Sequence, residues 1–436
     1  MRTSIIPAET DRTAPPHALV RGPLNRLAKR MVMALLEDVD IGELLLEDNG
    51  ERLAFGKASE DFPLRAVVTI HHPRFYRRAL WGGSIGAAEA YMAGDWSADD
   101  LTMVIRIMVL NRHIFEKMDS GWGRFMEPIH QWFHWLNKNT RAGSRANIVA
   151  HYDLGNDFYQ LFLDDTMTYS CGIFETEAST LREASVAKYD RICLKLDLQS
   201  SDHVLEIGTG WGGFAMHAAQ HYGCRVTTTT ISPAQFEWAK EYIDGEGLGD
   251  RVTLLLKDYR DLEGLYDKVV SIEMIEAVGH QFLETFFQCC SRLLKRDGMM
   301  LLQAITIADA VYDQHKRSVD FVKRYIFPGS CIPSLTAMCL AVARSTDLRV
   351  VHLEDLTPHY AKTLRAWRQR FFENIEQVRA LGYSDTFIRL WEYYLCYCEG
   401  GFEERYLGNV QMLMAKPFCR STPILPELPP SSGKST

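Results

Sequence analysis

The sequence VLEIGTGWGGF at residues 204–214 limits the possible folds of this chain more than any other feature. It indicates a short apolar strand, a glycine-rich turn and the start of an apolar helix. Gly208, Gly210 and Gly213 have the spacing that lets a backbone approach a bound nucleotide. A turn that only connects strand and helix would rarely carry so many glycines, because glycine weakens a helix start. We therefore predict a nucleotide pocket here, with two types of cofactor still open.

The second strand helps to choose between these cofactors. A nicotinamide site needs an acidic residue at the end of that strand, about 20 residues further on, to hold the adenosine ribose. Here the strand, residues 225–231, is rich in threonine and ends without an acid. Glu206 lies just before the first glycine and suits a cationic ligand without phosphate, such as S-adenosylmethionine. We therefore predict that the chain binds this methyl donor.

Strands and helical patterns alternate from residue 203 onward. The predicted strands are 203–208, 224–231, 251–256, 267–273 and 298–305. This alternation indicates an α/β fold, a doubly wound Rossmann-like sheet with helices on both faces. Ligands of such sheets bind beyond the carboxyl ends of the strands. The segment 306–344 interrupts the alternation, and we predict that it forms a lid or a substrate wall.

The length of 436 residues suits two domains, and the sequence places a smaller α+β domain at 19–120. It begins with a basic amphipathic helix from Leu24 to Leu35. Strands flank a hairpin turn at Asn49-Gly50, a third strand follows at 64–70, and a helix capped near Asp100 runs to about Met118. An aromatic and basic linker, 121–144, leads to the catalytic domain, 145–422. The tails 1–18 and 423–436 are predicted to be disordered.

Two segments have both a packing and a membrane interpretation. We expect the helix at 24–35 to pack its apolar stripe on its own domain, with docking on an anionic bilayer as the alternative. The linker places tryptophans beside histidine, lysine and arginine, which suits a bilayer interface and also a buried connection. Both interpretations of the linker stay open.

Composition excludes several classes of protein. A net charge of −8 and an isoelectric point near 6.0 argue against a nucleic-acid-binding protein. Ten cysteines without paired zinc spacing indicate neither a disulfide scaffold nor a metal site, and they fit the reduced cytoplasm. His71-His72 lacks a second ligand pair nearby. No apolar run approaches a membrane span and no secretory signal opens the chain, so we expect a soluble or peripheral protein.

Several motifs, in order along residues 145–420, resemble the cyclopropane-fatty-acid synthase and mycolic-acid methyltransferase family. They are HYDLGNDF at 151–158, MTYSCGIF at 167–174, the glycine turn, SIEMIEAVG at 271–279 and HYAKTL at 359–364. The resemblance implies a class I methyltransferase that moves the sulfonium methyl to a cis double bond in a phospholipid acyl chain. Loss of a proton to bound bicarbonate then closes a cyclopropane ring. A relative that makes methyl- or methylene-branched chains is the alternative.

The resemblance also carries site residues and partners. It assigns bicarbonate to Cys171, Glu276, Tyr360 and the backbone amide of Ile305. Gln303 stands where the family typically has a histidine, which puts the route of the departing proton in question. Cys398 matches a cysteine regarded as the family's nucleophile, but direct methyl transfer needs no covalent adduct, so we expect it to be structural. The family further implies a homodimer that works on membrane phospholipids at the inner face of the membrane, and the first domain is similar to the lipid-binding part of longer synthases.

The cofactor residues follow by the same resemblance. The methionine end is assigned to Tyr169, Ser170, Leu205, Glu206, Gly208, Gly210 and Gly212, and the ribose and adenine to Thr230, Ile231, Gln235, Asp258 and Tyr259. Without the motifs, Cys171 would be an ordinary core residue and Asp258 an ordinary loop residue. Two rivals from other classes remain, a nicotinamide oxidoreductase and a non-catalytic lipid-binding protein.

Overall fold

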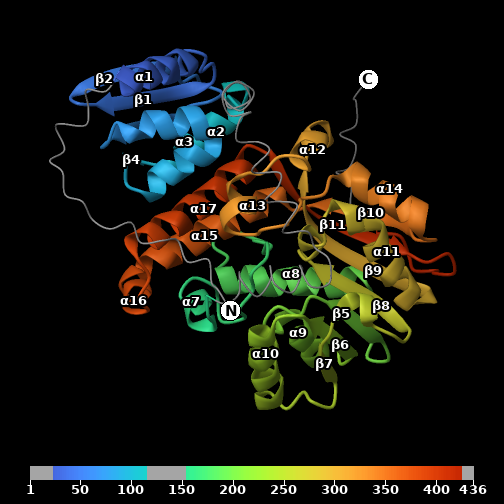
Figure 1. Ribbon diagram of the computed structural model, residues 1–436. Helices are drawn as coiled ribbons and strands as arrows, with labels where there is room; N and C mark the ends of the chain where they lie inside the picture. Colours follow the sequence, from blue (N-terminus) through green and yellow to red (C-terminus); the bar gives the residue numbers. More distant parts are fainter. Residues whose placement is uncertain (1–22, 115–153, 425–436) are drawn as a thin grey trace, which may run out of the picture. The chain divides into compact units, whose positions relative to one another are not determined.

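The computed structural model describes residues 23–114 and 154–424 of the chain (Figure 1). The chain divides into two compact units, residues 1–124 and 125–436, and each is described by itself. The predicted linker, the predicted tail at 1–18 and all but the first two residues of the predicted tail at 423–436 lie outside the described residues.

The first unit is a four-stranded sheet with three described helices, as the predicted α+β domain requires. Its elements are α1 (Pro23–Leu36), β1 (Gly42–Asp48), β2 (Glu51–Lys57), β3 (Arg65–Ile70), α2 (Arg74–Met92), β4 (Trp96–Ala98) and α3 (Leu101–Leu110). The strand order is β2-β1-β3-β4. The hairpin turn is confirmed, because Asn49 and Gly50 have φ values of 52° and 83° between the antiparallel strands β1 and β2.

The predictions made for two helices of this unit have different outcomes. The packing interpretation of α1 is supported in part: the helix buries Ala28, Val32 and Leu36 at helical spacing, whereas Leu24 and Leu27 of the predicted apolar stripe are 56% and 54% exposed. Asp100 caps α3 as predicted, its side chain accepting from the Met103 amide at 2.9 Å. The prediction that α3 runs to Met118 is wrong. The helix ends at Leu110 because the buried Asn111 side chain turns back to accept from the Asp40 amide at 2.8 Å.

The second unit contains a seven-stranded sheet in the order β10-β11-β9-β8-β5-β6-β7. The strands are β5 (His203–Ile207), β6 (Arg225–Thr230), β7 (Val252–Leu256), β8 (Tyr266–Ile272), β9 (Leu294–Ile307), β10 (Arg349–Asp355) and β11 (Leu407–Ala415). The predicted strands are confirmed as β5 to β9, all parallel to their neighbours among these five. The sequence analysis missed β10 and β11, which extend the sheet antiparallel from β9.

Helices cover both faces of this sheet, which confirms the doubly wound α/β fold (Figure 1). On one face lie α8 (Leu181–Lys195), α9 (Gly213–His221) and α10 (Pro233–Gly245), and on the other α11 (Leu283–Leu293) and α14 (Leu335–Ser345). Helix α14 falls within the segment predicted as a lid. Its residues Met338, Ala341 and Val342 are buried in the core with α11, so this part of the segment belongs to the folded body.

The remaining helices pack beside the sheet. They are α7 (Asn156–Gln160), α12 (Asp309–His315), α13 (Phe321–Tyr325), α15 (Thr357–Glu373), α16 (Ile375–Ala380) and α17 (Asp385–Glu403). Phe158 of α7 joins them through rings, at centroid distances of 6.2 Å from Phe371 and 4.8 Å from Trp391. These aromatic contacts fix α7, α15 and α17 to one another.

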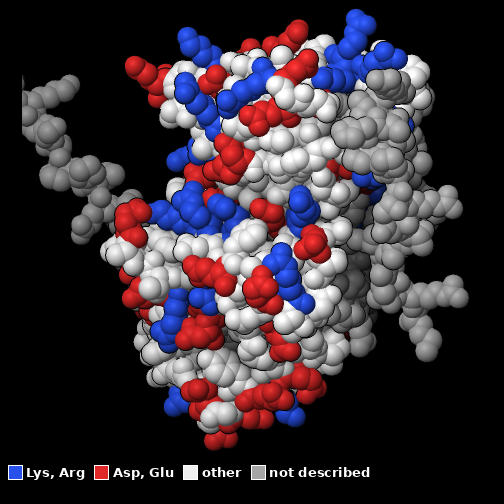
Figure 2. Space-filling model, turned by 90° about the vertical axis from the view of Figure 1, so that its left-hand side faces the viewer, with Lys and Arg blue, Asp and Glu red and all other residues white. Residues whose placement is uncertain are grey.

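The surface charge and the apolar character of the helices can be compared with the sequence analysis. On the face drawn in Figure 2, lysines and arginines lie among aspartates and glutamates, in keeping with the net charge of −8. Within residues 23–114 and 154–424, no helix combines the length and apolar character needed to cross a membrane.

Candidate active site

The glycine turn after β5 has a backbone that only glycine adopts readily. Gly208, Gly210 and Gly212 have φ values of 100°, 53° and 96°, and α9 begins at Gly213. A Cβ on Gly208 would lie 3.3 Å from the side chain of Met274, just after β8. A Cβ on Gly210 would meet nothing within 4 Å. The turn therefore lies beside the end of β8 and leaves open space at Gly210.

Glu206 lies on β5 directly before this turn and is 2% exposed. Its carboxylate accepts from the Thr228 hydroxyl at 2.6 Å, and Thr228 is 2.7 Å from the Thr209 hydroxyl. Burial raises the pKa of Glu206 to about 8. The fully buried Lys188 of α8 acts on it electrostatically and donates to the Ser170 hydroxyl at 2.7 Å. Glu206 and Ser170, two predicted cofactor residues, are thus connected through Lys188.

The raised pKa of Glu206 gives a prediction about the bound cofactor. Glu206 holds its proton at pH 7, and a sulfonium nearby would favour the ionised form. Binding of S-adenosylmethionine at pH 7 should therefore release up to one proton, and its affinity should rise with pH and level off above about 8. Titration calorimetry in buffers of different ionisation enthalpy measures this release. S-adenosylhomocysteine, which lacks the sulfonium charge, and the Glu206→Gln variant should each release much less; equal release in all three cases contradicts the assignment.

The residues predicted to hold ribose and adenine follow strands β6 and β7. Thr230 donates to the side-chain oxygen of Gln235 at 2.9 Å, and both are buried beside Ile231 at the end of β6. Asp258 is held by Arg260, with contacts of 2.8 and 2.7 Å, and Tyr259 packs against Phe286 at 5.5 Å. In the loop after β7, the Asp258 carboxylate is therefore already paired with a cation.

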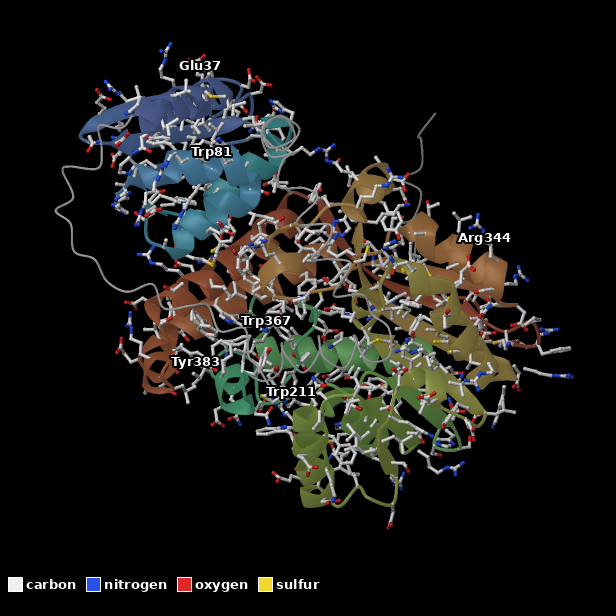
Figure 3. All side chains as sticks on the ribbon, viewed as in Figure 1. Glu37, Trp81, Trp211, Arg344, Trp367 and Tyr383 are labelled. Atoms are coloured by element: carbon white, nitrogen blue, oxygen red, sulfur yellow. The ribbon has the colours of Figure 1, made fainter. Side chains whose placement is uncertain are left out.

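Tyr169 lies in a set of aromatic rings that line this part of the second unit. Its hydroxyl is 2.9 Å from that of Tyr394 on α17, and its ring is 5.1 Å from Trp367 on α15. Trp211, in the glycine turn, lies 4.9 Å from Tyr159. In Figure 3, Trp211 and Trp367 lie in the interior of this unit, whereas Arg344 lies at its outer edge. Aromatic faces of this kind attract a cation through their π electrons.

Glu273, the first residue after β8, is the centre of a hydrogen-bonded cluster that the sequence analysis did not foresee. Its Oε1 accepts from the Cys171 amide at 3.1 Å, from Gln303 Nε2 at 2.9 Å and from Asn409 Nδ2 at 2.7 Å. Its Oε2 accepts from the Tyr360 hydroxyl at 2.7 Å. Four donors from different parts of the chain thus converge on one carboxylate.

The donors around Glu273 are themselves fixed. Gln303 and Gln411 face each other across β9 and β11, and Gln411 Nε2 donates to Gln303 Oε1 at 3.0 Å. Lys195 of α8 donates to Gln411 Oε1 at 2.7 Å. Lys195 can only donate and Glu273 can only accept. This row of hydrogen bonds, from Lys195 to Glu273, therefore sets the orientation of the Gln411 and Gln303 side-chain amides. The row holds Gln303 as a donor towards Glu273.

Helix α15 fixes the other side of the cluster. Thr363 accepts from the Gly172 amide at 3.1 Å, and His359 accepts from the Phe174 amide at 3.2 Å. One turn of α15 thus holds both the segment after Cys171 and the hydroxyl of Tyr360. Burial and the charge of Glu273 raise the pKa of Tyr360 well above its ordinary value, so it stays a donor.

Glu276 lies one turn beyond Glu273 and is a second buried carboxyl group. Its Oε1 accepts from the Ile305 amide, and its Oε2 has no hydrogen-bond partner among the described residues. Burial, followed by the charge of Glu273, raises the pKa of Glu276 to about 8. At neutral pH, Glu276 therefore holds its proton.

The residues assigned to bicarbonate are brought together, but their donors are not free for an anion. The Cys171 amide and the Tyr360 hydroxyl donate to Glu273, and the Ile305 amide donates to Glu276. A second anion placed among them would face the Glu273 carboxylate without these donors. The arrangement around Glu273 therefore does not fit bicarbonate.

Of the two predicted cysteines, Cys171 is buried and Cys398 is half-buried. Burial raises the pKa of the Cys171 thiol well above its ordinary value, and its Sγ donates to the Gly172 carbonyl at 3.2 Å. Desolvation, followed by the charge of Asp320, also raises the pKa of Cys398 on α17. Neither thiol is poised as a thiolate nucleophile, which agrees with the structural role expected for Cys398.

Sequence reasoning missed Glu273, Asn409, Gln411 and Lys188. One signal was present for Glu273, which lies within the motif at 271–279 and directly after a predicted strand. Asn409 and Gln411 lie in the unpredicted strand β11, and Lys188 lies in a helix of mixed polarity. Leu205 was assigned to the cofactor, but its side chain lies in the apolar core, so only its backbone can face a ligand.

Comparisons with known proteins agree with this geometry. A family model described as mycolic acid cyclopropane synthetase matches residues 139–412. The chain is 35% identical over 427 residues to a tuberculostearic acid methyltransferase of Mycobacterium tuberculosis, covering 94% of this chain and 96% of that relative. It is 35% identical over 364 residues to the cyclopropane-fatty-acyl-phospholipid synthase of Escherichia coli strain K12, covering 80% and 88%.

Solved structures give the same result. The cyclopropane synthase MmaA2 of Mycobacterium tuberculosis superimposes with a TM-score of 0.59 at 31% identity, over 62% of this chain and 98% of that one. The mycolic acid cyclopropane synthase CmaA1 complexed with SAH and CTAB gives 0.59 at 34% identity, again over 62% and 98%. The methyltransferase fold removes the nicotinamide alternative. The chain belongs to the mycolic acid cyclopropane synthetase family and is an S-adenosylmethionine-dependent methyltransferase with the class I fold.

Proposed function

We propose that this methyltransferase alkylates a cis double bond in an unsaturated fatty acyl chain of a membrane phospholipid. The observation that carries the proposal is the cluster of Glu273, Glu276 and Tyr360 beside the glycine turn, next to a wall of aromatic rings. An alkene is a weak nucleophile, and its alkylation creates a carbocation. Fixed negative charge and π faces are the groups that stabilise such a cation.

The cofactor side fits the same reaction. The buried Glu206 and the hydroxyl of Ser170 lie near the turn, where they would hold the charged methionine end of S-adenosylmethionine. When bound, the cofactor supplies an electrophilic methyl group on a positively charged sulfur. A water-poor site of buried aromatic residues prevents water from attacking the cation.

The cation can have two fates. A cyclopropane ring forms if the added methyl loses a proton while the charge stays on the neighbouring carbon. A methylene branch forms if a hydride first moves between the two carbons and the same methyl then loses the proton. A related cyclopropane-fatty-acyl-phospholipid synthase and a related tuberculostearic acid methyltransferase represent the ring and the branch.

The branched product is favoured by the surroundings of Glu273. Glu273 accepts four hydrogen bonds, so most lone pairs of its carboxylate are already occupied and few can receive a proton. Slower removal of the proton leaves time for the hydride shift. Gln303 adds no second base, since an amide does not take up a proton at neutral pH.

Lipid analysis after expression in a host with monounsaturated phospholipids tests the proposal. We expect acyl chains heavier by one CH2, because ring and methylene products have the same mass. Catalytic hydrogenation separates them, since a methylene branch takes up hydrogen under mild conditions that leave a ring intact. A host whose unsaturated chains all keep their original mass, with soluble protein that binds the donor, contradicts the proposed function.

A further inference from the structure

We infer that Glu273 takes the place of a bound anion: its carboxylate faces the carbocation and receives the proton from the transferred methyl. This inference rests on the proposed function and assigns the base for that reaction. It makes the chain independent of bicarbonate, whereas the family resemblance implied a bicarbonate-dependent reaction.

The first support is the number of donors that Glu273 occupies. Cys171 and Tyr360, both assigned to an external anion by the motifs, donate instead to this side chain, through an amide and a hydroxyl respectively. The cluster therefore already contains the negative charge that such an anion would bring. Its donors come from four separate segments, so the carboxylate is held in place before any substrate binds.

The second support is the backbone of Glu273. Its φ of 49° lies in the left-handed region, which a non-glycine residue adopts only at a cost. Its amide donates to the Gln303 carbonyl at 2.8 Å, which ties this conformation to the end of β9. Strained backbone of this kind persists only where the surrounding structure holds it, and it supports a functional role for the group that it carries.

The third support is that one oxygen of Glu273 remains able to accept a proton. Cys171, Gln303 and Asn409 are each 0% exposed, whereas Glu273 keeps partial exposure. Oε1 accepts from three donors, and Oε2 accepts only from the Tyr360 hydroxyl. Oε2, which accepts fewer hydrogen bonds than Oε1, therefore has a free lone pair.

The reaction balances with these groups alone. The π electrons of the alkene form a bond to the methyl carbon while the sulfur keeps the electrons of the broken C–S bond. The neighbouring carbon becomes a cation. A C–H bond of the new methyl then gives its proton to Glu273 Oε2, and its electron pair closes the ring or, after the hydride shift, forms the methylene double bond. The Glu273 carboxyl later returns the proton to water.

The test measures lipid alkylation by the full-length protein in carbon-dioxide-depleted buffer and in buffer with added bicarbonate. Wild-type rates should be equal within twofold. Glu273→Gln should lower kcat by about 100-fold or more, because the amide keeps most hydrogen bonds but cannot take the proton. Binding of S-adenosylmethionine and the melting temperature should stay close to wild type in this variant, which separates a lost base from a lost fold.

A second variant, Glu273→Gly, makes the test sharper. Glycine adopts the observed φ without strain and leaves a space lined by the same donors. Its low rate should rise at least tenfold when bicarbonate or formate is added, whereas Glu273→Gln, which fills the space, should gain nothing. A wild type that loses activity tenfold without bicarbonate, or a Glu273→Gln variant with wild-type kcat, overturns the inference. A wild type that alkylates no lipid in either buffer contradicts the proposed function instead.

Discussion

Replacing Phe371 with alanine is expected to lower the free energy of unfolding of the second unit by about 3–5 kcal/mol. Phe371 is 0% exposed on α15, and its ring packs against Phe158 of α7, which in turn contacts Trp391 of α17. The substitution leaves a cavity among rings that three helices hold in place, so the surroundings can collapse only partly. The same helices carry Tyr360 and Tyr394 to the site, so activity should also fall.

Phe372 provides the matched control. It is the next residue on the same helix and is 37% exposed. Phe372→Ala should cost about 1–2 kcal/mol, less than Phe371→Ala, because more than a third of the Phe372 surface is already in contact with water. Urea denaturation followed by tryptophan fluorescence compares the two variants. Equal losses would show that the aromatic cluster does not fix these helices.

Replacing Gly86 with alanine is expected to destabilise the first unit by about 3 kcal/mol or more. Helix α2 is kinked at Gly83, which has φ 56° and ψ −138°. The kink brings Gly86 against the chain eight residues earlier, and a Cβ there would lie 1.9 Å from the Arg78 carbonyl oxygen. Because the obstacle is backbone, a side-chain movement cannot relieve the overlap.

Gly82, on the same helix, provides the control. It separates the effect of this overlap on stability from the effect of helix propensity. A Cβ at Gly82 would meet nothing within 4 Å, so Gly82→Ala should be neutral or stabilise the unit by up to about 1 kcal/mol. Hydrogen exchange of the β1 and β3 amides reports on the stability of the first unit alone. Full protection in Gly86→Ala contradicts the observed path of α2.

The sequence predicted the parallel part of the fold because apolar strands and helices alternate there with a clear period. It missed β11 for a physical reason. This strand is buried, yet Asn409 and Gln411 interrupt its apolar pattern because they take part in the hydrogen bonds around Glu273. Sequence rules fail most often where a site imposes polar residues on a buried strand. Helix α2 was missed because Gly82 and Gly83 suggest a turn, although the chain uses them for a kink.

The site was predicted in part. The motifs assigned Cys171, Glu276 and Tyr360 to one site. In the structure, Cys171 and Tyr360 contact Glu273, three residues before Glu276, and Met274 of the same loop lies beside the glycine turn. The motifs did not identify Glu273, the group at the centre of the site. The position of Glu273 depends on its backbone angle and on donors from β9, β11 and α15, which are distant in sequence. Only the assembled fold shows that one carboxylate takes up those donors.

The fate of a labelled methyl group tests most directly whether the protein alkylates a phospholipid double bond and then removes a proton from the new methyl. Purified protein, unsaturated phospholipid vesicles and S-adenosylmethionine with a CD3 group are incubated together, and the acyl chains are analysed by mass spectrometry. We predict chains that carry the new carbon with two deuterium atoms, together with one S-adenosylhomocysteine for each chain, because the transferred methyl loses a deuteron to form either product. Chains that keep all three deuterium atoms, or cofactor turnover without a labelled chain, would contradict the account.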